Sequence, residues 1–360
     1  MSAHRRLAAL AASVALLVGT APTAADAAVR EPAAKERVKV ATYNLYIGGD
    51  VGTLLAPGID TTPEFIAAAT ALWQNVVATN FAERAEAIAD LLSETNPDVV
   101  GLQEVALWES APFGTATLAR TYDFLAILRA ELAERDTPYK VLVTNTNFVS
   151  PNVPLQPVGL NVRLTDRDVI IARSDLPKSQ LQTSRPRPRT YTARVPITLP
   201  TGPSAVIRGW STIDVTTGGL TYRFANTHLE AFSEQVRNLQ AAQLTRVLRK
   251  SPHPVVLVGD LNADPGTGAA RVLRKGVGMA DAWSQGTGSR FTAGQDDLLR
   301  NDPSTLSRRI DYVLFESNRK PDFAAKKAFV IGESTADRTS TGMWPADHAG
   351  VVARLRLTTN

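Results

Sequence analysis

Apolar and polar residues alternate along several short segments of the chain, as expected for β-strands with one buried face. This alternation, together with short apolar runs, predicts strands at residues 37–45, 98–105, 139–144, 168–172, 191–198, 205–216, 220–227, 255–258, 310–315, 326–331 and 350–357. Apolar residues at helical spacing predict helices at residues 81–94, 121–135 and 234–250. Ser233 is the expected N-cap of the last helix, and Gly218-Gly219 is expected to form a tight hairpin. Residues 145–164 are rich in Asn and Pro and are predicted to form a long loop.

Two of the predicted strands end in polar residues that lie two positions apart. Asn226 and His228 continue the apolar face of the strand at 220–227, and Asp260 and Asn262 continue that of the strand at 255–258. Side chains two apart in a strand point to the same face of the sheet. We therefore expect a buried sheet face that becomes a functional site at its rim.

Other acidic, amide and histidine side chains occupy comparable positions along the chain. They are Asn44 after Val38, Val40 and Thr42, Glu104 after Val100 and Leu102, Asp311 inside an apolar strand, and Asp347-His348 before the last strand. Carboxylate and amide oxygens suit a hard cation such as Mg²⁺, and an imidazole can transfer a proton near neutral pH. Taken alone, each residue is equally compatible with a solvated strand end, a turn or a structural histidine.

In chain order, six short motifs resemble the endonuclease/exonuclease/phosphatase superfamily. They are Tyr43-Asn44, Gln103-Glu104, Asn226-x-His228, Gly259-Asp260-x-Asn262, Arg309-Ile310-Asp311-Tyr312 and Asp347-His348. The superfamily includes deoxyribonuclease I, neutral sphingomyelinases, inositol polyphosphate 5-phosphatases and abasic-site endonucleases. The resemblance implies an α/β fold of two stacked mixed β-sheets flanked by helices, in which residues 37–360 form one catalytic domain.

The same resemblance implies a divalent-metal-dependent phosphoester hydrolase, most of all a phosphodiesterase in which water attacks phosphorus in line. Asn44, Glu104 and Asp347 are the expected metal ligands, for one or two Mg²⁺ or Mn²⁺ ions. A secreted binding protein that kept the fold and lost the chemistry is the alternative from another functional class.

Five further residues are expected to act on the substrate. The resemblance pairs His348 with Asp311, which makes His348 a general base or a stabiliser of the phosphate. His228 would donate to a phosphoryl oxygen or to the leaving group. Asp260 and Asn262 would position the attacking water or bind a second metal ion.

The N-terminal segment has the features of a secretory signal. A basic stretch at residues 4–6 precedes an apolar run at residues 7–18, and Ala25-Asp26-Ala27 fits a small-x-small cleavage site. We expect an exported protein with a signal peptide at residues 1–27, of the Sec type rather than the twin-arginine type. Residues 28–36 are expected to be a disordered lead, and nothing later in the sequence is long and apolar enough to span a membrane.

Composition narrows the chemistry further. The chain has no cysteine, which excludes disulfides, thiolate metal sites and cysteine nucleophiles. Loss of residues 1–27 would change the formal charge from +4 to +3, because Arg5, Arg6 and Asp26 are removed. This mild charge permits an anionic substrate without identifying a nucleic acid. A monomer is expected.

Histidines at both positions 228 and 348 resemble the deoxyribonuclease, sphingomyelinase and inositol phosphatase branches. Residues 307–311 lack the Trp and the Asp-Arg pair of the inositol 5-phosphatases. Nucleic acid is the first substrate expected. Arg185, Arg187 and Arg189 would contact its phosphates, although a solvated, stiff loop explains these arginines equally well.

Sphingomyelin or another phospholipid is the second substrate expected, and a phosphomonoester is the third. Trp108 and Phe113 are predicted to lie in a loop just after Glu104, where they could contact a lipid or a base. Residues of this kind also commonly cap a hydrophobic core.

Overall fold

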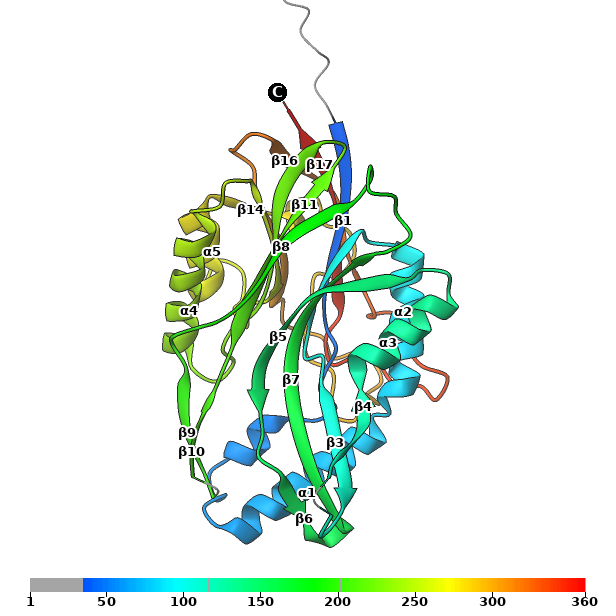
Figure 1. The fold of residues 1–360 in the computed structure, drawn as a ribbon, viewed down its shortest axis with the longest axis vertical. Coiled ribbons are helices and arrows are strands. Elements are labelled where there is room, and N and C mark those ends of the chain that lie inside the picture. Colours follow the sequence, from blue (N-terminus) through cyan, green and yellow to red (C-terminus); the bar gives the residue numbers. More distant parts are fainter. Residues whose placement is uncertain (1–34, 116, 201, 360) are drawn as a thin grey trace, which may run out of the picture. The chain divides into compact units, whose positions relative to one another are not determined.

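The structure, a computed structural model, describes residues 35–115, 117–200 and 202–359. These residues pack as one compact unit in which two mixed β-sheets lie face to face, with helices on the outer side of each sheet (Figure 1). The four-layer α/β fold implied by the sequence is confirmed. No helix in this part of the chain is long and apolar enough to cross a bilayer.

The larger sheet has nine strands, in the order β16-β17-β1-β2-β7-β3-β4, with β5 and β6 also pairing with β7. Its strands are β1 (Lys35–Asn44), β2 (Val99–Gln103), β3 (Leu107–Pro112), β4 (Ala119–Asp123), β5 (Tyr139–Val149), β6 (Val153–Leu155), β7 (Leu160–Arg173), β16 (Asp322–Ile331) and β17 (Gly350–Thr358). The pair β1 and β2 is parallel, and the other pairs in this sheet are antiparallel.

The smaller sheet has six strands, in the order β14-β15-β13-β12-β11-β8. They are β8 (Gln182–Thr190), β11 (Gly209–Thr217), β12 (Leu220–His228), β13 (Val255–Asp260), β14 (Met279–Asp281) and β15 (Asp311–Glu316). A separate hairpin consists of β9 (Val195–Leu199) and β10 (Gly202–Val206). The pair β12 and β13 is parallel, so the site-bearing ends of these two strands lie at the same edge of the sheet.

Helices cover the outer faces of both sheets. They are α1 (Thr62–Ala78), α2 (Phe81–Thr95) and α3 (Phe124–Glu134) beside the larger sheet, and α4 (Glu234–Leu248) and α5 (Gly268–Val277) beside the smaller one. Short 3₁₀ turns are η1 (Val51–Leu55), η2 (Gln156–Val158), η3 (Ala282–Gln285) and η4 (Thr335–Asp337). Ser233 caps α4 by accepting a hydrogen bond from the backbone N–H of Val236, which confirms the predicted N-cap.

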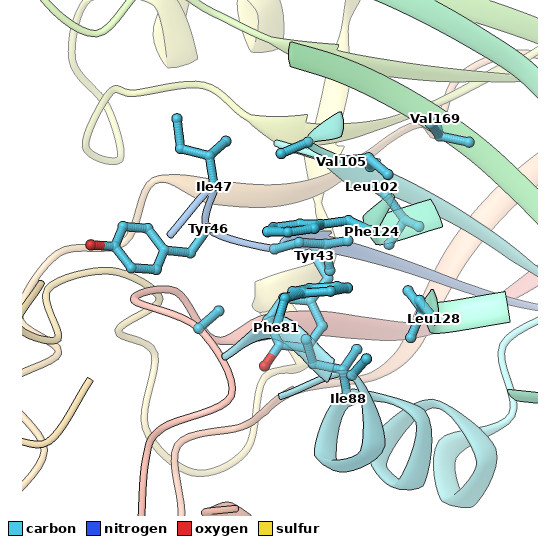
Figure 2. Packing of buried hydrophobic residues seen from close by; sticks show 14 of the residues in the cluster. Tyr43, Tyr46, Ile47, Phe81, Ile88, Leu102, Val105, Phe124, Leu128 and Val169 are labelled. Carbon is cyan, nitrogen blue, oxygen red and sulfur yellow. The ribbon is translucent and has the colours of Figure 1, made fainter. Parts of the chain in front are cut away.

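Three hydrophobic layers hold these elements together. The inner layer joins the two sheets through residues such as Val40 on β1, Phe224 on β12 and Val258 on β13. In the outer layer beside the larger sheet, Phe81 and Phe124 stack with ring centroids 3.6 Å apart (Figure 2). This burial fixes which face of each strand is apolar, and so fixes which face carries the polar residues at the strand ends.

Several segments differ from the sequence prediction. The loop predicted at residues 145–164 is wrong, because β5 continues to Val149, β6 follows, and β7 begins at Leu160. Register shifts between Val141 and Val143, and between Thr146 and Phe148, interrupt the alternation of β5 and hide the strand. The loop predicted after Glu104 is also a strand, β3, which contains Trp108.

Other segments were missed or given different bounds. The Pro-rich segment with the three arginines is not a loop but the edge strand β8, whose exposed polar positions leave no apolar pattern. Helices α1 and α5 were not predicted, although α1 begins with a capping box between Thr61 and Glu64. Strand β1 begins at Lys35. Residues 35 and 36, which were predicted to belong to the disordered lead at residues 28–36, are therefore part of this strand. The rest of that lead and the predicted signal peptide lie outside the described residues.

Candidate active site

Three neighbouring strands of the smaller sheet bring three candidate residues into one row. His228 at the end of β12 lies opposite Asp260 at the end of β13, and Asp260 lies opposite Asp311 at the start of β15. All three side chains are buried. The period of two predicted from the sequence therefore places these residues along the inner face of the sheet, at its rim.

Gly259 allows β12 and β13 to approach closely beside this row. Its φ of +141° lies in a region that other residues rarely adopt, and a Cβ there would lie 1.9 Å from the carbonyl oxygen of Thr227. Only glycine fits, so the Gly259-Asp260 sequence is what sets the carboxylate of Asp260 against His228.

The larger sheet contributes Asn44 and Glu104 from the opposite side. The side-chain amide of Asn44 donates to Oδ2 of Asp260 at 3.3 Å, which links the two sheets at the site. Glu104 does not lie on the face that the sequence suggested, since Val100 and Leu102 pack into the outer layer beneath the helices. Glu104 follows the end of β2 with a φ of +54°, and its Oε2 accepts the backbone N–H of Ile47 at 2.9 Å.

Asn226 has a structural role between the sheets. Its Oδ1 accepts from the amide of Gln103 at 2.7 Å, and its Nδ2 donates to the carbonyl of Leu102 at 3.0 Å. A Cβ on Gly101 would lie 2.6 Å from Oδ1 of Asn226, so the absence of a side chain there makes room for the bridge. Asn226 thus joins the sheets just below the site.

His348 pairs with Asp311. Nδ1 of His348 lies 2.9 Å from Oδ2 of Asp311, and its Nε2 lies 3.9 Å from Oδ2 of Asp260. Burial alone would lower the pKa of His348, but the carboxylates of Asp311, Asp347 and Asp260 raise it well above its usual range. This environment favours the charged form of the imidazole.

His228 has the opposite electrostatic environment. Burial, and then the charge of Arg208, lower the pKa of His228 well below its usual range, so the ring is neutral. The guanidinium of Arg208 lies 3.1 Å from Nδ1 and can only donate, so Nδ1 accepts and the ring hydrogen is on Nε2. Nε2 faces the site, 3.5 Å from Oδ2 of Asp260.

Asn262 helps to orient Asp260. Its backbone N–H donates to Oδ1 of Asp260 at 2.8 Å, and its side-chain amide donates to the carbonyl of Leu229 at 3.0 Å while lying 3.2 Å from Nε2 of His228. A φ of +48° turns the chain at Asn262, so the residue leaves the strand yet stays at the site. Asn262, Glu104 and Asp347 are partly exposed and form the open side of the cluster.

Comparison with known proteins identifies the family. The profile described as "Endonuclease/Exonuclease/phosphatase family" matches residues 41–348, a span that contains every residue of this cluster. The chain belongs to this family. Members of this family are phosphoester hydrolases. A comparison of this chain with curated proteins finds no match.

Solved structures of the endonuclease/exonuclease/phosphatase family share the fold at low sequence identity. A family member from Bacteroides thetaiotaomicron has a TM-score of 0.56 and 15% identity, covering 90% of this chain and 99% of that one. A mannosyl-6-phosphatase from the same organism has a TM-score of 0.54 and 16% identity, over 88% and 99% of the two chains. D. rerio TDP2 complexed with a single-strand DNA product has a TM-score of 0.53 and 19% identity, over 89% and 98%.

Enzymes of the endonuclease/exonuclease/phosphatase family generally use divalent metals, and the carboxylates here suit such an ion. Burial, and then the negative charges of Asp347 and Asp166, raise the pKa of Glu104 to about 7. Oδ1 of Asp347 is buried and has no hydrogen-bond partner among the described residues. Crowded carboxylates with unused oxygens are what a hard cation needs, so Glu104 and Asp347 fit a metal site, with Asn44 beside them.

A second group of potential ligands lies next to the first. One ligand atom from each of Asp260, Asp311 and His348 can be chosen so that all lie within 4.8 Å of one another. Burial, and then the charge of Asp311, raise the pKa of Asp260 to about 7. Asp260, Asp311 and His348 are therefore a second candidate set of metal ligands.

Sequence reasoning assigned no role to three charged residues beside the site. Arg208 lies 3.6 Å from Oδ2 of Asp166, and both are buried. Asp168 is also buried, and it lies near Asp166 and Asn147. Burial, and then the charge of Asp166, raise the pKa of Asp168 well above its usual range. Asp166 and Asp168 lie two apart and continue toward Ile170, so the spacing rule that found Asp260 would have found them too.

Arg84 on α2 was also missed. Its guanidinium is fully buried and donates to the carbonyls of Thr79, Leu45, Tyr46 and Pro345. The Leu45 and Pro345 carbonyls belong to the segments that carry Asn44 and Asp347. The sequence does contain one indication of this role, because Arg84 is a charged residue within the apolar stripe of a helix.

The three arginines predicted to contact phosphates lie on the edge strand β8. Arg189 is opposite Trp210 and Arg187 is opposite Thr212 in the register with β11. Trp210 packs in the layer beneath α4 and α5, so this face is turned away from Asn226 and His228. Arg185 lies 3.8 Å from Asp214.

Proposed function

We propose that the protein is a divalent-metal-dependent phosphodiesterase in which water attacks phosphorus in line. The observation that carries this proposal is the continuous cluster at the rim of the two sheets. It combines oxygen ligands from Glu104 and Asp347, a carboxylate at Asp260, and two histidines in different protonation states. Such a cluster supplies neutralising charge, a base and hydrogen-bond donors, which are the requirements of phosphoester hydrolysis.

Asp260 is the base in this scheme. It lies at the centre of the cluster, where Asn44 and the backbone of Asn262 orient its carboxylate. His348, held by Asp311 and charged, stabilises the phosphate rather than removing a proton. This choice favours the second of the two roles expected for His348 from the sequence, and it follows from the carboxylates that surround the imidazole.

His228 donates a hydrogen bond from Nε2 to a phosphoryl oxygen. Arg208 fixes the tautomer by donating to Nδ1, so His228 offers a neutral donor without changing its charge. A cation at Glu104 and Asp347, with Asn44 beside them, would neutralise phosphoryl oxygens and make the attacking water more acidic. In-line attack requires the water and the leaving group to lie on opposite sides of phosphorus.

The nature of the substrate is part of the proposal. Nucleic acid is supported by membership of a family whose relatives include TDP2, whose structure was solved with single-strand DNA product. The outward position of Arg187 and Arg189 gives it no support. We also propose that the protein is exported and monomeric, which N-terminal sequencing of protein from the culture medium and size-exclusion chromatography would test.

A parallel assay tests the function. The protein would be incubated with Mg²⁺ or Mn²⁺ and with bis(p-nitrophenyl) phosphate, p-nitrophenyl phosphate, plasmid DNA, RNA and sphingomyelin. We expect hydrolysis of the phosphodiester dye to exceed that of the monoester. Inactivity on every phosphoester, with metal present and the protein folded, would instead support the binding protein that has lost its chemistry.

A further inference from the structure

An apolar cavity lies directly beside the candidate metal site. Its enclosed volume is about 140 Å³, and one side is open to solvent. An apolar cavity of about 150 Å³ is large enough to bind a small hydrocarbon such as benzene. Residues from α1, η1, the ends of β5 to β7 and the β9–β10 hairpin line it, and these elements lie at one end of the unit (Figure 1).

The walls of the cavity are mainly aliphatic. They include Leu72, Trp108, Leu164, Ile197 and Val206. The polar side chains gather where the cavity meets the site, at Glu104, Asp166 and Arg208. Because Glu104 lines both the site and the cavity, a ligand whose phosphate lies at Glu104 can extend an apolar group directly into the cavity.

The β9–β10 hairpin forms one wall. Along β9, Val195, Ile197 and Leu199 are turned inward, while Pro196 and Thr198 between them are exposed. The hairpin pairs with neither of the two sheets. Its apolar face thus covers the cavity rather than extending a sheet.

The mouth of the cavity is apolar as well. Leu55 on η1 and Phe232 before α4 line it, yet 36% and 49% of their respective surfaces are exposed. Exposed apolar side chains beside a deep apolar pocket are typical of a surface that receives an apolar ligand.

An aliphatic chain suits this cavity better than a nucleobase does. A base carries polar edge groups, and burying such groups without hydrogen-bond partners is costly. Apart from Ser150 and the three charged residues at the site, the lining side chains are aliphatic or aromatic. The indole N–H of Trp108 already donates to the carbonyl of Ile47. An alkyl chain needs no hydrogen-bond partner.

We propose that the substrate is a phosphodiester with a long alkyl or acyl chain, and that the cavity binds the chain while the phosphate lies at Glu104 and Asp347. This rests on the proposed phosphodiesterase function for the phosphate half. It makes the lipid class, placed second from the sequence, the favoured substrate.

The test is a series of alkyl p-nitrophenyl phosphates with methyl, butyl, octyl and dodecyl groups, assayed with Mg²⁺ below the concentration at which they form micelles. Each buried methylene should raise kcat/KM by up to about four-fold, since it contributes roughly 0.8 kcal/mol. We expect the dodecyl ester to exceed the methyl ester by on the order of 100-fold or more. Equal values along the series would overturn the chain-binding proposal while leaving the phosphodiesterase intact.

A pair of neighbouring variants locates the effect. Ile197→Asp puts a charge on the inward face of the hairpin, and Thr198→Asp puts the same charge on its exposed face. We expect the ratio of dodecyl to methyl kcat/KM to fall at least ten-fold in Ile197→Asp and to stay unchanged in Thr198→Asp. If Ile197→Asp fails to fold, Val206→Trp, which fills the cavity, should lower the same ratio. Unchanged ratios in folded Ile197→Asp and Val206→Trp would overturn the assignment of the cavity.

Binding without turnover separates the two proposals. Calorimetric titration in EDTA with dodecyl phosphate and with methyl phosphate should show chain-dependent binding to the wild-type protein. Such binding without hydrolysis of any ester, even with metal, would support the cavity and contradict the phosphodiesterase. Cleavage of plasmid DNA with no chain-length effect on binding or rate would overturn the lipid substrate.

Discussion

The catalytic cluster and the apolar cavity are adjacent, yet they are built in different ways. The cluster consists of residues at the ends of central strands, such as His228 and Asp260, and their register fixes their spacing. The cavity is formed by α1, by the hairpin and by the outer parts of β5 to β7. Glu104 and Arg208 belong to both regions. The comparison indicates that the sheets position the residues that carry out the reaction. The elements around the sheets determine which group attached to the phosphate can bind.

The largest effect should come from the metal. Removal of divalent cations with EDTA should abolish hydrolysis, and Mg²⁺ or Mn²⁺ should restore it. Glu104→Gln keeps the shape of the side chain and removes its charge, so it should cost several kcal/mol of transition-state stabilisation, or roughly 10³-fold in rate. Full activity after thorough chelation would contradict the metal mechanism, and circular dichroism would confirm that the variant is folded.

The two histidines should have the next largest effects. His348→Ala and His228→Ala should each lower kcat roughly 10²- to 10⁴-fold. Asp311→Asn should cause a milder loss than His348→Ala, because the imidazole remains and only its charged partner is lost. His253, which lies 4.0 Å from Asp214 and away from the cluster, provides the control, and His253→Ala should be near wild type. Activity near that of the wild-type protein in all three histidine variants would mean that His228 and His348 are structural.

Arg84 tests the support beneath the cluster. Arg84→Met should leave buried carbonyls unpaired, at a cost of about 1–3 kcal/mol each in the free energy of unfolding. Urea unfolding followed by circular dichroism would measure this loss. Arg120→Met is the control, since 70% of that side chain is exposed, and it should change stability by less than about 0.5 kcal/mol. Equal stability of the two variants would show that Arg84 does not hold the Asn44 and Asp347 segments together.

Metal binding should also change the pH dependence of stability. The pKa values of Glu104 and Asp260 are raised to about 7, so the stability that their protonated forms contribute is lost as the pH rises toward and through 7. A cation binds the deprotonated carboxylate of Glu104, so Mg²⁺ should raise Tm more at about pH 8 than at roughly pH 5.5. Thermal melts with and without Mg²⁺ measure this difference. A larger gain at the lower pH would contradict the assignment of Glu104 to the metal site.

The smallest effect should come from the arginines of β8. Replacement of Arg185, Arg187 and Arg189 by Ser should leave kcat/KM for bis(p-nitrophenyl) phosphate unchanged, because this edge strand is turned away from the cluster. The chain-length series should be unaffected too. A steep rise in the KM for DNA, together with a weaker salt dependence, would instead restore nucleic acid as the substrate.

The comparison also explains what the sequence could predict. His228, Asp260 and Asp311 were found because each continues or interrupts an apolar strand, and a period of two keeps such residues on one face. Arg208 was missed because its partners His228 and Asp166 are distant in sequence. Arg84 lies in the apolar stripe of α2, but its bonds to the carbonyls of Leu45 and Pro345 could not be inferred from that position. The cavity could not be predicted, since the shifts in β5 obscured a strand and the hairpin packs through tertiary contacts alone.

The most direct test combines the two regions in one measurement, the kcat/KM ratio of dodecyl to methyl p-nitrophenyl phosphate in Glu104→Gln and in Ile197→Asp. We predict that Glu104→Gln lowers the rates for both esters by similar factors and keeps the ratio, whereas Ile197→Asp lowers the ratio. The reverse pattern, with Glu104→Gln changing the ratio and Ile197→Asp leaving it unchanged, would contradict the division between a catalytic cluster and a chain-binding cavity.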